Sequence, residues 1–234
     1  MAFQSNKFNA FIAASATAVL VSTAVAPTAS AANFKDVPDS SRYKAATDFL
    51  FTKGVKGFAD GTFGVNANIT RADAAVMLVN VLGLDIESAP SAGFTDVNER
   101  IAKHINALYA AEITKGAGNN KFNSYAQITR GELAIWLQKA FNLTAKEMKT
   151  TFADVGNRYK EAVAALVENK IAQGKNSTSF GITAPATRGE YSLFLERAFS
   201  AEVQISLEAA IKEAEQAIGA LPSAEDLTEE IGLY

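Results

Sequence analysis

One set of short motifs occurs three times along this chain, in the same order and at nearly the same spacing. Each copy opens on Phe-x-Asp-Val, continues through a glycine and then a phenylalanine, and closes on a Thr-Arg motif followed by an acid. The motifs are Phe34–Val37, Phe94–Val97 and Phe152–Val155; Gly57, Gly116 and Gly174; Phe63, Phe122 and Phe180; and Ile69–Asp73, Ile128–Glu132 and Ala186–Glu190. The glycine, phenylalanine and arginine positions each advance by 59 and then 58 residues. A register kept over three copies predicts three equivalent units that bury their apolar faces against one another.

The repeats divide the chain into five segments. We expect a signal peptide, three repeat units and a helical tail that could open a further domain, over residues 1–31, 32–91, 92–150, 151–202 and 203–234. In the first segment Lys7 precedes a stretch rich in Ala and Val, and Ala29–Ala31 fits the small-x-small pattern of signal cleavage. That stretch is short and rich in Ser and Thr compared with the roughly 20 apolar residues of a membrane span. We therefore expect no span in the mature chain.

A first helix is predicted after each Phe-x-Asp-Val motif, because apolar residues follow there at the helical i, i+3, i+4 spacing. These residues are Ala46, Phe49 and Leu50; Ile105, Leu108 and Tyr109; and Val163, Leu166 and Val167. A glycine-containing loop comes next, and we expect its phenylalanine to pack onto the core.

A second helix is predicted to begin at each Thr-Arg motif. Thr70, Thr129 and Thr187 suit the N-cap, and the acid three residues later suits a capping box, of which Asp73 is the shorter and weaker version. An apolar stripe at i, i+3, i+4, i+7, i+8 follows, which indicates one buried face. The stripes are Ala74, Met77, Leu78, Val81 and Leu82; Leu133, Trp136, Leu137, Ala140 and Phe141; and Tyr191, Phe194, Leu195, Ala198 and Phe199. We predict a mainly α fold in which these three helices pack against each other.

The tail has a helical pattern of its own. Ser206 is predicted to cap a helix that carries Leu207, Ile211 and Ile218 and ends near Gly219. Ser223 then begins a second, acidic segment.

Composition excludes several classes of protein. The chain has no cysteine and one histidine, His104, so disulfides, zinc–thiolate sites, cysteine nucleophiles and His-rich metal centres are absent from it. A net charge of −3 argues against nucleic-acid binding by a strong basic field. No nucleophile elbow, Walker loop or metal-ligand spacing occurs, so we expect neither catalysis nor a cofactor.

The arginine of the Thr-Arg motif breaks a local rule. Arg71, Arg130 and Arg188 occupy the first helical position, where the positive end of the helix dipole opposes a cation by a few tenths to about one kcal/mol. A carboxylate or phosphate placed there would meet free helix amides, the dipole and a guanidinium together. The alternative is a structural ion pair with a nearby acid, for which the candidates are Asp36, Asp96 and Asp154. Repetition does not decide between the two, since an ion pair would repeat as well.

Two lysines could add positive charge to a pocket beside the arginines. Lys56 and Lys115 precede the loop glycine, where copy three has Gln173, so Arg188 is the weaker candidate for binding an anion. The alternative for both lysines is an ordinary solvated loop position.

Aromatic residues and the histidine are weaker candidates. Tyr43 and Tyr159, early in the first helix, could offer a ring face to a sugar or could be half-buried packing residues. Copy two has Ile101 in that region, so an aromatic platform is missing there. His104 is assigned no role, and Trp136 is expected in the core as part of its stripe.

The motifs together resemble the S-layer homology domain family, over roughly residues 32–200. The threefold arrangement behind a signal peptide is similar to the N-terminus of S-layer proteins from Bacillus-like Gram-positive bacteria. The resemblance implies a pseudo-threefold fold around a central three-helix bundle with one helix from each unit. It also implies a secreted module that binds pyruvylated secondary cell wall polysaccharide, linked to peptidoglycan, in grooves between units. Ketal-linked pyruvate carries a carboxylate, which matches the anion inferred from the arginines.

Roles follow from the resemblance for the matching positions. It implies that Arg71, Arg130 and Arg188 contact the carboxylate, and that Asp36, Asp96 and Asp154 line the grooves or brace the arginines. It implies that Gly57, Gly116 and Gly174 let the backbone approach the sugar, with Lys56, Lys115, Tyr43 and Tyr159 as further candidate contacts. The chain departs from the family pattern at Asp73, Gly131 and Gly189, so we expect unequal grooves.

Two other functions stay open from the sequence. The region could anchor an exported cell-wall or polysaccharide-degrading enzyme, or it could belong to a lattice-forming S-layer subunit. Self-association into such a lattice would use regions not present in this sequence.

Overall fold

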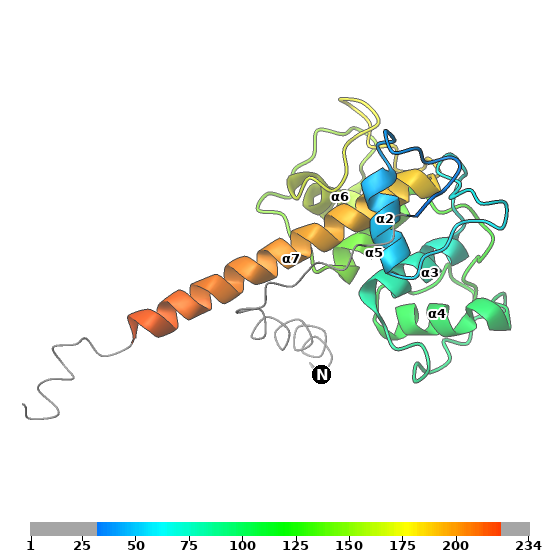
Figure 1. The fold of residues 1–234 in the computed structure, drawn as a ribbon, viewed down its shortest axis with the longest axis horizontal. Coiled ribbons are helices and arrows are strands. Elements are labelled where there is room, and N and C mark those ends of the chain that lie inside the picture. Colours follow the sequence, from blue (N-terminus) through cyan, green and yellow to red (C-terminus); the bar gives the residue numbers. More distant parts are fainter. Residues whose placement is uncertain (1–31, 221–234) are drawn as a thin grey trace, which may run out of the picture. The chain divides into compact units, whose positions relative to one another are not determined.

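The computed structural model describes residues 32–220 (Figure 1). The predicted signal peptide and the predicted acidic segment from Ser223 lie outside these residues. Six helices occupy the described part: α2 (Lys44–Thr52), α3 (Arg71–Leu82), α4 (Glu99–Ala110), α5 (Arg130–Ala140), α6 (Asn157–Glu168) and α7 (Arg188–Gly219). Extended structure within the same residues is limited to isolated antiparallel bridges, so the predicted mainly α class is confirmed. Among these helices, none is both long and apolar enough to cross a bilayer.

The predicted first helices are α2, α4 and α6, one in each copy. Most of their predicted apolar positions are buried, but Tyr109 and Val167 are 42% and 39% exposed. The ring of Tyr109 packs edge-on against Phe94 and leaves the rest of its surface to solvent. The loop phenylalanines Phe63, Phe122 and Phe180 are fully buried, which confirms that they pack onto the core.

The predicted second helices are α3, α5 and the beginning of α7, and their caps are formed as expected. The hydroxyls of Thr70, Thr129 and Thr187 each accept the backbone N–H of the acid three residues later. Glu132 and Glu190 reach back to the backbone N–H of their threonine, at 3.0 and 3.1 Å. The shorter Asp73 instead accepts the hydroxyl of Thr70. The capping box is therefore complete in copies two and three and incomplete in copy one.

Backbone hydrogen bonds close the three copies into a ring. The N–H of Ile128 donates to the carbonyl of Ile69, that of Ala186 to Ile128, and that of Ile69 to Ala186, at 3.0–3.1 Å. Each copy thus donates to one neighbour and accepts from the other, which is the predicted pseudo-threefold arrangement. The stripes of α3, α5 and α7 are buried inside this ring except for the partly exposed Phe199. Tyr191 of α7 is fully buried and donates its hydroxyl to the carbonyl of Ala74 in α3, which joins two of these helices directly.

The first amides of each second helix are also used in the ring. In α3 the N–H of Arg71 donates to Ala126 and the N–H of Ala72 donates to Ser124, both in the loop of copy two. The equivalent amides of α5 and α7 donate to Ala184 and Ile182, and to Ala67 and Val65. The expectation of free amides for an anion at these helix N-termini is therefore wrong, because the next copy and the threonine cap already occupy them.

Each first helix packs against the second helix of the preceding copy rather than against its own. α4 lies along α3, and α6 lies along α5 (Figure 1). α2 completes the cycle through Phe49, whose ring centroid is 5.2 Å from that of Phe199 in α7. Each packed pair of helices therefore combines the second helix of one copy with the first helix of the next. A single copy in isolation has no partner for the apolar stripe of its second helix.

The described residues divide after Glu202 into the three-copy ring and the remainder of α7. Ser206 lies within α7 and does not cap a separate helix, because neither Gly nor Pro interrupts the chain between Gly189 and Gly219. The predicted end at Gly219 is confirmed. Beyond Glu202 this helix carries exposed apolar side chains, among them Leu207, Ile211 and Ile218.

Candidate functional site

The three motif arginines are buried and bridge neighbouring copies. Arg71, Arg130 and Arg188 are 4%, 3% and 6% exposed. Each donates its Nε to the carbonyl of the loop phenylalanine in the next copy: Arg71 to Phe122 at 2.8 Å, Arg130 to Phe180 at 2.9 Å, and Arg188 to Phe63 at 2.9 Å. Each guanidinium also lies within 4.7–5.1 Å of the centroid of that phenylalanine ring. The arginines therefore have a structural role in the ring, whatever else they bind.

The acids that pair with these arginines differ from the predicted ones. Arg71 pairs with Glu132 at 2.6 Å and Arg130 with Glu190 at 3.3 Å, so the partner is the capping acid of the next copy. The corresponding acid for Arg188 is Asp73, whose side chain is shorter than that of glutamate. Nη1 of Arg188 instead approaches the sulfur of Met77 at 3.6 Å. Burial lowers the pKa of all three guanidinium groups, and the nearby carboxylates oppose that shift. Within residues 32–220, the structure contains no ion pair between these arginines and Asp36, Asp96 or Asp154.

The turn aspartates hold the loop that the arginines bind. Asp36 accepts the N–H groups of Phe63, Gly64 and Val65, and Asp96 and Asp154 bind the equivalent segments. Burial tends to raise the pKa of these carboxyl groups, but the hydrogen bonds outweigh it and lower the pKa of each, that of Asp154 to about 2. They brace the arginines indirectly, by fixing the loop whose phenylalanine carbonyl accepts the guanidinium.

The loop glycines have a packing reason that does not depend on a ligand. A Cβ on Gly57, Gly116 or Gly174 would lie 2.3–2.6 Å from the ring of Phe34, Phe94 or Phe152, the first residue of the same copy's opening motif. Those rings in turn pack on the buried loop phenylalanines, with centroids 5.1–5.7 Å apart. Of the three glycines, Gly116 also lines a pocket.

That pocket has a volume of about 170 Å³ and is built from all three copies. Copy one supplies Arg71, copy three supplies Arg158, and the rest comes from the loop and α5 of copy two. The lining includes Thr114, Lys115, Gly116, Glu132, Trp136 and Lys139. Four basic side chains thus face one acidic side chain, and the indole of Trp136 stacks on Phe122 with a centroid separation of 6.0 Å. Such a pocket suits a small anionic group beside an apolar ring.

Arg71 retains donor capacity that its two counterparts have used. Nη2 of Arg130 donates to the carbonyl of Gln173 at 2.6 Å, and Nη2 of Arg188 donates to that of Lys56 at 3.3 Å. Within residues 32–220, Nη2 of Arg71 makes no such bond. These contacts also correct the predicted pairing: Gln173 faces Arg130, not Arg188, because each arginine reaches the loop of the following copy.

The equivalent positions around the other two arginines are filled differently. Lys175 pairs with Glu190 at 3.2 Å, so that carboxylate serves Arg130 and a lysine together. Arg188 lies between the rings of Phe58 and Phe63, at 4.9 and 4.7 Å. Trp136 and Lys139 of the pocket correspond in sequence to Phe194 and Arg197 of copy three and to Met77 and Asn80 of copy one. The surroundings of the three arginines are therefore unequal.

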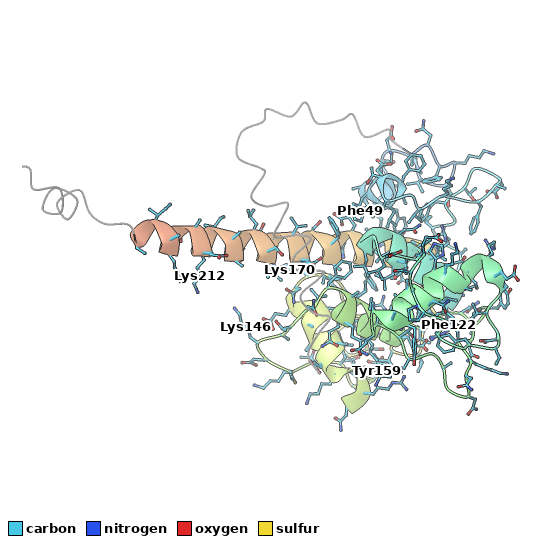
Figure 2. All side chains as sticks on the ribbon, turned by 90° about the horizontal axis from the view of Figure 1, so that it is seen from below. Phe49, Phe122, Lys146, Tyr159, Lys170 and Lys212 are labelled. Carbon is cyan, nitrogen blue, oxygen red and sulfur yellow. The ribbon has the colours of Figure 1, made fainter. Side chains whose placement is uncertain are left out.

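Tyr43 and Tyr159 are half-buried and cover glycines. Tyr159 is labelled in Figure 2. A Cβ on Gly189 would lie 2.8 Å from the ring of Tyr43, and one on Gly131 would lie 3.0 Å from the ring of Tyr159. Copy two has the smaller Ile101 at this position of its first helix, and the preceding second helix there carries Ala72. A glycine on the second helix therefore occurs where a tyrosine packs on it, and an alanine occurs where the smaller Ile101 takes the place of the tyrosine. The glycines and the missing aromatic residue thus have one steric explanation.

Several pocket residues were missed by the sequence reasoning. Trp136 and Lys139 lie one and two turns after Glu132 on α5, so helical spacing could have placed them on the same face. Arg158 follows from no local pattern, because its position depends on which copies are neighbours. His104 is not among the residues that line the pocket at Arg71. It has a buried Nδ1 without a hydrogen-bond partner among the described residues, and burial lowers its pKa.

Comparison with known proteins adds an independent line of evidence. The S-layer homology domain profile matches residues 33–75, 93–134 and 151–192. The S-layer protein EA1 of Bacillus anthracis is 33% identical over 172 residues, which cover 71% of this chain and 20% of that protein. The surface-layer 125 kDa protein of Lysinibacillus sphaericus is 34% identical over 203 residues, 82% of this chain and 17% of that protein.

A protein with an enzyme's name is also similar. An uncharacterized cell wall amidase of Bacillus anthracis is 31% identical over 146 residues, which cover 60% of this chain and 27% of that protein. The chain thus spans about a fifth of the length of the two S-layer relatives and about a quarter of the amidase.

Proposed function

The chain belongs to the S-layer homology domain family, and from this membership we propose that it anchors a secreted surface protein to the Gram-positive cell wall. The ligand is pyruvylated secondary cell wall polysaccharide, bound without a covalent bond. The S-layer names of the relatives support a surface protein of that kind. The anchoring region itself is not catalytic.

The observation that carries the proposal is the pocket around Arg71. A pyruvate carboxylate there would meet the unused Nη2 of a buried, rigidly held guanidinium, together with Lys115, Lys139 and Arg158. A charge-assisted bond to a guanidinium fixed in this way loses little side-chain entropy on binding. The basic residues exceed the single acid, Glu132, so the pocket favours an anion over an uncharged group.

The three grooves contribute unequally in this proposal. The pocket at Arg71 is the principal site, because Arg130 and Arg188 each donate Nη2 to a loop carbonyl. A ligand beside either of those arginines would meet a guanidinium with one fewer free N–H group than Arg71 offers. We expect the ligand to bind at Arg130 and Arg188 with lower affinity than at Arg71, and therefore to occupy them only after the site at Arg71 is saturated.

A sacculus pull-down tests the proposed ligand. The chain is incubated with purified sacculi, with sacculi stripped of the polysaccharide, and with sacculi whose polysaccharide is intact but freed of pyruvate. We expect binding to the first, no binding to the stripped sacculi, and loss of most of the binding, but not all of it, for the sacculi freed of pyruvate. Equal binding to the preparations with and without pyruvate would refute carboxylate recognition.

The similarity to a cell wall amidase favours a second candidate, in which the same anchor holds an exported wall enzyme. Anchoring is common to both candidates, so they differ in the cargo. Zymography of the secreted protein that carries this chain, with cell wall and with soluble glucan as substrates, separates them. A cleared band at the mass of that protein would support the enzyme candidate.

A further inference from the structure

One exposed aromatic residue lies outside the pocket and outside the core. Tyr125, in the loop after Phe122, is 74% exposed. The corresponding residues of the other copies are Asn66 and Thr183. The three copies act as internal controls, because positions that the fold requires recur in all of them. The ring of Tyr125 is therefore not required by the fold, and its exposure to water needs another explanation.

The ring of Tyr125 is held in place by the protein. Its hydroxyl accepts the side-chain amide of Asn98 at 3.0 Å, and the other end of that amide caps α4 by accepting the N–H of Ile101 at 3.3 Å. The preceding residue, Ser124, is 1% exposed and donates its hydroxyl to the carbonyl of Asp96 at 3.0 Å. Its own carbonyl accepts the N–H of Ala72 from copy one. An aromatic face fixed in this way is preorganised for a ligand.

The depression beside the ring is polar, and its lining holds one acid and no base, although Lys121 is near enough to help lower the pKa of that acid, Asp96. An open depression is lined by Asp96, Asn123, Ser124, Tyr125 and Ala126. The carboxylate of Asp96 accepts the N–H groups of Phe122 and Asn123 at 2.7 and 2.8 Å, so each of its oxygens is anchored and keeps a second lone pair. An anion would be repelled by this carboxylate.

A flat ring beside carboxylate and amide groups fits an uncharged sugar. The carbon-bound hydrogens of a pyranose can lie on the ring face, while its hydroxyl groups donate to the carboxylate and the amide oxygen. We propose that Tyr125, with Asp96 and Asn123, forms a second carbohydrate subsite that binds a neutral sugar residue. This inference rests on the proposed function in one respect, that the sugar belongs to the same wall polysaccharide as the pyruvate.

The experiment measures binding of the full chain to purified wall polysaccharide freed of pyruvate, with uncharged methyl pyranosides, with and without an N-acetyl group, as small probes. The variants are Tyr125→Thr, which introduces the residue of copy three, and Tyr125→Trp, which keeps an aromatic face. Asn66→Thr changes the equivalent exposed position of copy one and is the matched control. Melting temperature and sedimentation are recorded for all of them, and binding to the intact polymer is measured in parallel.

We expect Tyr125→Thr to weaken binding of the neutral polymer about three- to tenfold, as for loss of one aromatic contact. Tyr125→Trp keeps the affinity, Asn66→Thr has no effect, and no variant changes the melting temperature. Unchanged affinity in Tyr125→Thr would overturn the inference, as would a parent protein that binds neither the neutral polymer nor the probes. A change in sedimentation without a change in sugar binding would also overturn it and would indicate a protein contact. None of these results depends on whether pyruvate is recognised at Arg71.

Discussion

At the scale of single residues, each motif arginine links two copies, and Arg71 also lines a pocket. A guanidinium at the first helical position is opposed by the helix dipole, yet here its Nε binds a carbonyl of the next copy and its plane packs on a phenylalanine. Those contacts offset the dipole, so the broken local rule has a structural explanation. A ligand role then depends on what each guanidinium has left to donate, and Arg71 has the most.

Removing an arginine should destabilise the ring. Arg71→Ala removes the donor to the Phe122 carbonyl and the ion-pair partner of Glu132, in a site where the guanidinium is 4% exposed, so we expect a loss of about 2–4 kcal/mol in the free energy of unfolding. Arg100→Ala, an exposed arginine on α4, should change it by less than about 0.5 kcal/mol. Urea unfolding measures both. Equal stabilities of the two variants would contradict the structural role.

Acid should weaken the loop of copy three. Burial tends to raise the pKa of Asp154, but hydrogen bonds from Ile182, Phe180, Gly181 and Ser179 lower it from 3.8 to about 2. A depressed pKa means that the stabilisation is complete above the unfolded value and is lost as the pH falls through the folded one. We therefore expect the melting temperature to fall between about pH 4 and pH 2, and to fall less steeply in Asp154→Asn. Parallel pH curves for the parent and the variant would show that Asp154 does not contribute.

At the scale of helices and loops, the sequence predicts helix caps and apolar stripes, but it does not predict which copies contact one another. Capping by Thr129 and Glu132 and the stripe of α5 depend on residues three to eight positions apart, and the structure confirms them. The partner of Arg188 lies 125 residues earlier in the chain, in the loop of copy one. Nothing local specifies that contact, so the sequence reasoning assigned Gln173 to the wrong arginine. Pocket residues such as Arg158 were missed for the same reason.

The close packing of Gly189 against Tyr43 predicts that substitutions at these two positions have coupled effects on stability. In Gly189→Ala the new Cβ would lie 2.8 Å from the ring of Tyr43 and 2.7 Å from the carbonyl of Val65, so we expect a loss of about 1–3 kcal/mol in stability. The same change in a chain that also carries Tyr43→Ile should cost about 1 kcal/mol less, because the smaller side chain imitates the Ala72 and Ile101 pair. A double-mutant cycle by denaturant unfolding gives the coupling. Additive costs would contradict the steric explanation.

At the scale of the whole repeat region, the ring makes the three copies interdependent. Each stripe is covered by helices of other copies, and each loop is held by an arginine of the preceding one. This arrangement explains why the same motifs recur three times. It also explains how a pocket can combine Arg71, Lys115 and Arg158 from three copies.

The repeat region should therefore unfold in one step. We expect calorimetry to give a single transition for residues 32–202 within the full chain, with the protection of α3, α5 and the start of α7 against hydrogen exchange lost together. A fragment of residues 32–90 should not fold, because its stripe has no partner. A stable, sharply melting fragment would contradict the shared core.

The proposed function requires the pocket at Arg71 to recognise a carboxylate of the wall polysaccharide. Lys115 and Arg158 line this pocket and are exposed, so replacing both by Gln should change binding without changing stability, and Lys146→Gln on an exposed loop outside the pocket is the matched control.

The most direct measurement is the affinity of the parent, the Lys115→Gln/Arg158→Gln variant and the control for purified polysaccharide with and without its pyruvate, at one fixed salt concentration. We expect the double substitution to weaken binding of the pyruvylated polymer about tenfold or more and to leave binding of the pyruvate-free polymer unchanged, while the control behaves as the parent. An equal loss for both polymers, or no loss for either, would contradict the claim.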